Sequence, residues 1–126
     1  MSPPLPSVLI VDDQPELLRV FARGLEAAGY RVSTAESVEG AMLFMESDPP
    51  DAILVDLKMP YVNGMGMLYR LRQSHPRVPV AIITGRQDLD TETLQEIATL
   101  DATIHYKPLS IVQIRLIVDG LLGQQK

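Results

Sequence analysis

Three short and wholly apolar runs recur along this chain, at Val8–Val11, Ala52–Val55 and Val80–Ile83. Apolar runs of this length, without alternation, are typical of strands buried on both faces of a parallel sheet. Two more polar stretches, Arg31–Ala35 and Thr103–Tyr106, also predict strands. The first of these two is polar enough to indicate a strand at the edge of the sheet.

The stretches between these strands carry apolar residues at intervals of three and four, which predicts one amphipathic helix after each strand. The inward positions are Leu18, Phe21, Leu25 and Ala28; Val38, Ala41, Met42 and Met45; Gly64, Met67, Leu68 and Leu71; Leu94, Ile97 and Ala98; and Ile114, Ile117, Val118 and Leu121. Pro15 marks the first helix start, Ser37 and Ser110 are typical N-cap residues, and Asp88 or Asp90 opens the fourth helix. Five alternating strands and helices predict one doubly wound α/β domain with parallel strands and right-handed crossovers.

Length and composition are those of one globular domain. Of 126 residues 46% are hydrophobic and 21% charged, and the absence of cysteine excludes disulfides and thiolate metal sites. The net charge of −5 argues against a nucleic-acid-binding surface and fits a domain that gathers carboxylates around a cation. No apolar run approaches the roughly 20 residues needed to cross a bilayer, and the N-terminus lacks the pattern of a signal peptide. We therefore expect a cytoplasmic protein without a membrane partner.

Polar side chains stand at the carboxyl ends of four predicted strands. Asp12 and Asp13 follow the first run, Asp56 follows the central one, and Thr84 and Lys107 follow the last two strands. In an open parallel sheet these ends meet at one edge, where such folds hold their ligands. Three carboxylates in one place repel each other, and a hard divalent cation that prefers oxygen ligands, Mg²⁺, removes the repulsion.

A carboxylate beside a divalent cation, a lysine and a hydroxyl group has the chemistry of phosphoryl transfer. In this interpretation Asp56 attacks phosphorus and becomes an acyl phosphate, Lys107 neutralises charge on the transferring oxygens, and Thr84 hydrogen-bonds the phosphoryl group. Each residue also has a simpler interpretation as a solvated strand end or turn residue. Asp13 with Glu16, for example, fits a capping box at the start of the first helix. Only the joint occurrence of these residues favours the chemical interpretation.

The polar motifs follow one order along the chain: Asp12–Asp13, Asp56, Met59–Pro60, Gly64, Thr84 and Lys107–Pro108. With them the chain resembles the response-regulator receiver domain of two-component signalling, in the chemotaxis-regulator-like superfamily, over residues 8–122. The resemblance implies a flavodoxin-like (βα)5 three-layer sandwich with strand order 2-1-3-4-5.

The resemblance also implies a function. A sensor histidine kinase or a phosphotransfer protein would donate a phosphoryl group to Asp56 in a Mg²⁺-dependent reaction that switches partner or output interactions. Asp13 and Asp56 would be direct Mg²⁺ ligands, Asp12 would act largely through water, and the backbone carbonyl of Lys58 would be a further ligand. A cis peptide bond is implied before Pro108. Because the domain would modify only itself, we do not expect an enzyme that turns over an outside substrate.

Three alternatives fit the sequence less well. A receiver-shaped scaffold would not use its aspartate, yet the site is intact. An aspartyl-phosphate phosphatase needs a second catalytic aspartate two residues after the nucleophile, where this chain has Lys58. A flavin-binding protein of the same topology needs a phosphate loop after the first strand, where Asp12 and Asp13 would repel phosphate.

The sequence departs from the family pattern at Ile104. Three positions before the lysine, the family usually carries Tyr or Phe as the residue that reports phosphorylation. Tyr106 and His105 are expected to lie out of phase with Ile104, so helix shifts or aliphatic packing are expected to carry the signal. Lys58 lies two residues after Asp56, and Arg86 lies two residues after Thr84. Both long cations would crowd the attacking water at the mouth of the pocket, so we predict a long-lived acyl phosphate.

The last helix carries more apolar residues than one buried face can hold. Beyond its inward positions it adds Ile111, Val112, Leu116 and Leu122. Together with Ile104, this face predicts a contact with a second copy or with an output domain. The receiver domain is expected at residues 8–122, after a flexible lead-in at 1–7. The tail at 123–126 leaves open whether the chain stands alone or was cut before an output domain.

Overall fold

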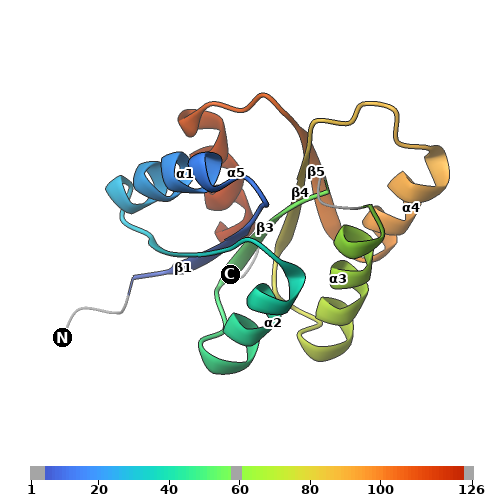
Figure 1. The fold of residues 1–126 in the computed structure, drawn as a ribbon, viewed down its shortest axis with the longest axis horizontal. Helices are drawn as coiled ribbons and strands as arrows, with labels where there is room; N and C mark the ends of the chain where they lie inside the picture. Colours follow the sequence, from blue (N-terminus) through green and yellow to red (C-terminus); the bar gives the residue numbers. More distant parts are fainter. Residues whose placement is uncertain (1–4, 58–60, 124–126) are drawn as a thin grey trace.

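The computed structural model describes residues 5–57 and 61–123, which form one parallel sheet covered by helices on both faces (Figure 1). The strands are β1 (Ser7–Val11), β2 (Arg31–Ala35), β3 (Ala52–Asp56), β4 (Val80–Thr84) and β5 (Ala102–Tyr106). Their order is β2-β1-β3-β4-β5, and all neighbouring strands pair in parallel. The predicted fold class, the strand order and the edge position of the second strand are therefore confirmed.

Five helices connect the strands and divide into two layers. They are α1 (Pro15–Ala27), α2 (Val38–Ser47), α3 (Tyr61–Ser74), α4 (Thr91–Thr99) and α5 (Ile111–Gly123). In Figure 1, α1 and α5 cover one face of the sheet, and α2, α3 and α4 cover the other. Because successive strand residues point to opposite faces, β3 supplies both layers: Ile53 and Val55 join the core under α2, α3 and α4, and Leu54 joins the core under α1 and α5.

Helix starts agree largely with the capping signals. Ser37 and Asp90 accept hydrogen bonds from backbone N–H groups of the first turns of α2 and α4. At α5 the capping is reciprocal, since Ser110 Oγ accepts from the Gln113 N–H at 3.1 Å and Gln113 Oε1 accepts from the Ser110 N–H at 2.8 Å. Two unsatisfied donors of the last helix are thereby paired.

The buried face of α4 differs from the prediction. Thr93 and Ile97 are buried, Leu94 is half-buried and Ala98 is exposed. The helix is only nine residues long and packs near the sheet edge, so its buried contact narrows to the line of residues four apart. Ala98 lies off that line, and its predicted inward position is wrong.

The apolar surplus of α5 is only partly exposed. Val112 and Leu116 are 66% and 62% exposed, whereas Ile111 and Leu122 pack against the core shared with α1. For Ile111, the close approach of α1 explains the burial. A Cβ atom added at Gly24 would lie 2.5 Å from the Ile111 side chain, so the missing side chain of Gly24 lets the two helices meet.

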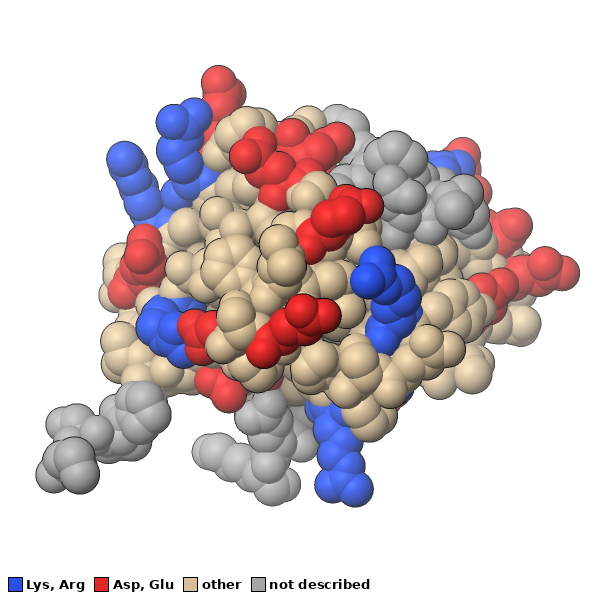
Figure 2. Space-filling view, turned by 60° about the horizontal axis from the view of Figure 1, so that its bottom comes forward, with Lys and Arg blue, Asp and Glu red and all other residues tan. Residues whose placement is uncertain are grey.

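Among the described residues, none of the helices combines the length and apolar character needed to span a membrane. Figure 2 shows Asp and Glu side chains spread over one face, with Lys and Arg side chains interspersed among them and some of these close together only at the upper left. On that face the described residues form no continuous basic patch of the kind that binds nucleic acid.

Candidate functional site

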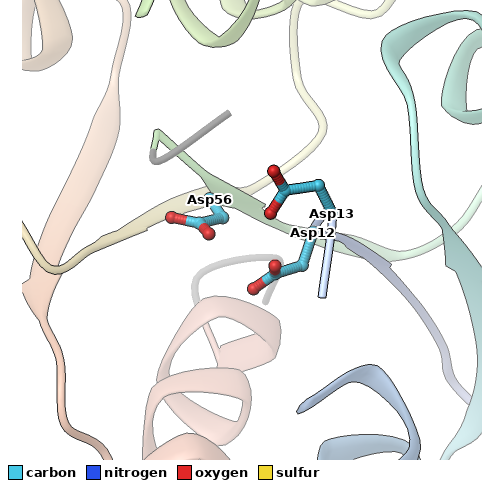
Figure 3. A group of neighbouring side chains, drawn as sticks. All are labelled: Asp12, Asp13 and Asp56. Atoms are coloured by element: carbon cyan, nitrogen blue, oxygen red, sulfur yellow. The ribbon is translucent and has the colours of Figure 1, made fainter. Parts of the chain in front are cut away.

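Three aspartates meet at the carboxyl edge of the sheet. Asp12 and Asp13 follow the last residue of β1, and Asp56 is the last residue of β3, which is the neighbour of β1. Figure 3 shows their carboxylates gathered around one space, and their ligand oxygens all lie within 4.8 Å of one another. Asp12 and Asp56 are 3% and 2% exposed, and Asp13 is open to solvent. The predicted convergence of these three residues is confirmed.

Lys107 joins two of these aspartates. Its Nζ donates to Asp12 Oδ2 and to Asp56 Oδ2, each at 3.1 Å, and its side chain is only 15% exposed. The other oxygen of Asp12 accepts the Gln14 N–H at 2.9 Å. The Lys107 N–H donates to the Thr84 carbonyl at 2.8 Å, which fixes the end of β5 against β4. The implied cis Lys107–Pro108 peptide bond is present.

Thr84 lies at the same edge, one residue beyond Ile83, which pairs with Asp56 in the β3–β4 register. Its side chain is fully buried, and its Oγ1 accepts a hydrogen bond from the Arg86 N–H at 3.0 Å. A hydroxyl group combines acceptor lone pairs with one donor proton. The same side chain can therefore also donate to a phosphoryl oxygen.

The first turn of α1 contradicts one simpler interpretation. Gln14, not Asp13, is the N-cap residue of this helix, and Pro15 is its first residue. The capping box proposed for Asp13 and Glu16 is therefore wrong. Asp13 lies one residue before the cap, which leaves its carboxylate with Asp12 and Asp56.

The donor set fits a hard divalent cation. Three ionised carboxylates with one ammonium group leave an excess of two negative charges in a largely buried cluster. Oxygens bound to Mg²⁺ at about 2.1 Å lie roughly 3 to 4 Å apart, which is within the 4.8 Å spread of these oxygens. The site can therefore hold Mg²⁺ with oxygen ligands and water. Lys58, the predicted carbonyl ligand, lies outside the described residues.

At the mouth of the pocket, Arg86 binds Asp88. Its Nε donates to Asp88 Oδ1 at 3.2 Å, and the Arg86 side chain is 44% exposed. The hydrogen bond and charge of Arg86 lower the pKa of the Asp88 carboxyl group. The Arg86 guanidinium is therefore directed to a carboxylate of its own loop.

The phase of β5 differs from the prediction at Tyr106. Side chains of a strand alternate, so Tyr106 lies on the same face as Ile104, and only His105 lies on the other. Ile104 packs against the core under α4 and pairs with Ile82, whereas Tyr106 pairs with Thr84 and is 39% exposed. The expectation that Tyr106 is out of phase with Ile104 is wrong. His105 lies on the edge strand β5, with its Nε2 3.0 Å from Thr103 Oγ1.

A cavity of about 530 Å³ opens beside Lys107, between α1 and the loops that follow β4 and β5. Its lining consists of Gln14, Leu17, Phe21, Gly85, Arg86, Lys107, Pro108 and Leu109. Sequence reasoning placed Lys107 and Arg86 here and missed the apolar lining residues Leu17, Phe21 and Leu109. The pair Pro108–Leu109, apolar residues directly behind the lysine, is the signal that could have indicated an apolar wall.

A doubly wound five-stranded sheet with an acidic cluster and a lysine at its carboxyl edge has the architecture of a receiver domain. A family model of the response regulator receiver domain matches residues 8–119, and this chain belongs to that family.

Curated relatives are longer than this chain. The transcriptional regulatory protein PrrA of Mycobacterium tuberculosis is 32% identical over 120 residues, which are 95% of this chain and 51% of PrrA. The DNA-binding transcriptional regulator NtrC of Salmonella typhimurium is 36% identical over 83 residues, which are 66% of this chain and 18% of NtrC. The chain thus spans about half or less of these relatives.

Solved receiver domains superpose over nearly the whole chain. The response regulator receiver domain protein of Clostridium thermocellum is 28% identical with a TM-score of 0.82, and the match covers 96% of this chain and 97% of that one. The receiver domain of the Francisella response regulator 1452 is 26% identical with a TM-score of 0.83, and the match covers 96% and 99% of the two chains.

Proposed function

We propose that this domain takes a phosphoryl group onto Asp56 from a phosphohistidine of a sensor kinase or a phosphotransfer protein. The observation that carries the proposal is the Lys107 ammonium group, 3.1 Å from both Asp56 and Asp12 and beside the third carboxylate, Asp13. A lysine in this place binds the nucleophile and can also reach the group that the nucleophile receives. Membership of the receiver family supports the same chemistry.

In the transfer, a carboxylate oxygen of Asp56 forms a P–O bond as the P–N bond to the donor imidazole breaks, and the electron pair returns to the imidazole nitrogen. Lys107 would neutralise part of the charge on the transferred oxygens, in a place where little water competes. Thr84 would donate its hydroxyl proton to a phosphoryl oxygen, with its own oxygen held by the Arg86 N–H.

The acidic cluster would hold Mg²⁺, with Asp13 and Asp56 as direct ligands, Asp12 acting largely through water and the Lys58 carbonyl as a further ligand. When bound, the ion would neutralise charge on the transferring oxygens. The aspartates would hold the ion next to the reacting oxygen of Asp56. Lys107 would keep Asp12 and Asp56 in place.

The product is a modified state of the domain itself, so this domain would act as a switch that turns over no outside metabolite. Phosphorylation adds negative charge and acceptor oxygens at a buried edge. This change would shift an equilibrium between two conformations and thereby alter partner or output interactions. The exposed Val112 and Leu116 of α5 would contact a second copy or an output domain. Ile104, which the sequence grouped with this surface, packs under α4 on the other face of the sheet and does not belong to it. We place the domain in the cytoplasm, without nucleic-acid or membrane partners of its own.

Mass spectrometry after incubation with acetyl phosphate tests the proposal. We expect one added phosphoryl group with Mg²⁺, none with EDTA, and none in Asp56→Asn. Asp48→Asn is the matched control, because Asp48 is an exposed aspartate that binds Arg31 and lies outside the acidic cluster. A wild-type protein that stays unlabelled with Mg²⁺ would favour the scaffold that never uses its aspartate.

A further inference from the structure

Arg72, in the last turn of α3, binds backbone carbonyl groups in two neighbouring loops. Its Nε donates to the Leu100 carbonyl at 2.6 Å, one NH2 group donates to Val78 at 2.7 Å, and the other donates to Asp101 at 3.1 Å. Two longer bonds reach the carbonyls of His75 and Pro76, at 3.3 and 3.4 Å. One side chain therefore links the loop between α3 and β4 to the end of α4.

The C-terminal end of α4 has carbonyl groups that a cation such as Arg72 can stabilise. The last turn of α4 contains no basic residue of its own, and Leu100 is its C-cap. Carbonyl groups at a helix C-terminus lack intrahelical partners and carry partial negative charge. Asp101, the next residue, has a φ of +57°, so the chain turns sharply there. Arg72 supplies from α3 the positive charge and the donors that α4 lacks.

A second contact holds the same half of α4. Tyr69, one turn before Arg72 on α3, donates its hydroxyl proton to Glu96 Oε2 at 2.7 Å. Burial lowers the pKa of Arg72, which shows that the guanidinium gives up hydration to reach these carbonyls. The opposite end of α4 follows residues 85–90, whose side chains are exposed except for the half-buried Leu89. That segment begins directly after Thr84, the last residue of β4.

We infer that Arg72 is a positioning residue that fixes the C-terminal end of α4, so that a change at Thr84 moves residues 85–90 and the first turns of α4 about this fixed end. The inference rests on the proposed function for the ligand-induced movement, but the fixed end itself exists without phosphorylation. Only arginine has five donors in a planar fork. Lysine at this position would keep the charge and lose most of the carbonyl contacts.

Hydrogen exchange of the full chain tests the inference, first without ligand. In Arg72→Met we expect amide exchange at residues 97–101 to be about tenfold faster than in wild type, the effect of losing roughly one net hydrogen bond's free energy. The exchange rate of Arg72→Lys at these residues should lie between those of wild type and Arg72→Met. This variant remains informative if the methionine variant does not fold. Arg70→Met, an exposed position on the same helix, should match wild type. Unchanged exchange at 97–101 in both Arg72 variants would overturn the inference, whatever the function of Asp56.

The same variants are then compared with Mg²⁺ and beryllofluoride, a tetrahedral mimic of an acyl phosphate. In wild type we expect the probe to change the amide exchange rates at residues 85–94. The rates at residues 97–101 should stay within about twofold of their values without the probe. In Arg72→Met the change should spread to 97–101. A wild-type response over the whole of α4, or an equal spread in wild type and variant, would contradict a fixed end. A probe that changes nothing at residues 56 and 84–94 would contradict the proposed function, and the ligand-free comparison would still decide the role of Arg72.

Discussion

Replacing Asp13 by asparagine should stabilise the metal-free protein and weaken its response to Mg²⁺. The substitution keeps the shape of the side chain and removes one of three carboxylates whose ligand oxygens lie within 4.8 Å of one another. Asp13 is the exposed member of the cluster, whereas Asp12 and Asp56 both bind Lys107. Asp13→Asn therefore removes repulsion without leaving a buried lysine unpaired.

The magnitude follows from Coulomb's law. At 4.8 Å a pair of like charges costs roughly 0.9 kcal/mol in water and about 3.5 kcal/mol at an effective dielectric constant of about 20. Two such pairs include Asp13, and the Lys107 ammonium group bound to the other two aspartates offsets about one of them. With the value for water, which applies to an exposed group, the net repulsion is about 0.9 kcal/mol. The neutral asparagine side chain would lose an interaction of about 0.5 kcal/mol with the N-terminus of α1. The net gain is about 0.4 kcal/mol, or about 1–2 °C in melting temperature.

Thermal unfolding followed by circular dichroism measures the effect, in EDTA and at increasing Mg²⁺. In EDTA the variant should melt above wild type, and in about 1 M salt, where the Debye length is about 3 Å, the difference should vanish. At a Mg²⁺ concentration about 100-fold above its dissociation constant, wild type should gain about 2.7 kcal/mol, which reverses the order.

Glu16→Gln is the control, because Glu16 lies in the first turn of α1 but outside the acidic cluster. It should lose a little stability and keep the full Mg²⁺ response. The reasoning would be refuted if Asp13→Asn melted below wild type in EDTA, or if Mg²⁺ stabilised both proteins equally.

Three further predictions concern other parts of the chain. Ser110→Ala removes the cap that Ser110 shares with Gln113 and should cost about 1 kcal/mol of unfolding free energy in urea; an unchanged midpoint would contradict the capping box. Burial lowers the pKa of His105 below its ordinary 6.5, so as the pH falls the imidazole is protonated in the unfolded chain before it is protonated in the folded one. The free energy of unfolding should therefore fall as the pH drops below about 6.5. In urea titrations at pH values below about 6.5, His105→Gln should show a shallower fall than wild type. In a Lys58→Asn, Arg86→Glu double variant the acyl phosphate on Asp56 should have a shorter half-life by radiolabel decay, and an unchanged half-life would refute the role of these two cations.

The fold could be predicted because hydrophobic pattern and topology determine it together. Continuous apolar runs such as Ala52–Val55 have no exposed face, so they must lie inside a sheet, and alternation with helices makes that sheet parallel. Once the strands are parallel, their carboxyl ends share one edge. Asp12, Asp56 and Thr84 were therefore brought together by topology, without any information about side-chain contacts.

What the sequence could not provide depends on distances between helices. Ile111 and Leu122 of α5 read as surplus apolar residues, but both pack against the core that α5 shares with α1, and at Ile111 Gly24 permits the close approach of the two helices. Ala98 of α4 read as inward, but a nine-residue helix at the sheet edge buries only a narrow line. Periodicity tells which residues share a face of a helix. It does not tell how wide the covering surface is.

The question that the sequence left open was how β5 responds to the site, and strand geometry narrows it. Ile104 is packed in the core under α4 and pairs with Ile82, so moving it outward would leave a cavity. Tyr106 lies on the same face, pairs with Thr84 and is 39% exposed, so its ring can change rotamer without opening the core. Of Ile104 and Tyr106, the side chain that can change rotamer without opening the core is therefore the aromatic residue opposite Thr84. The packed Ile104 instead fixes the strand on which that residue stands.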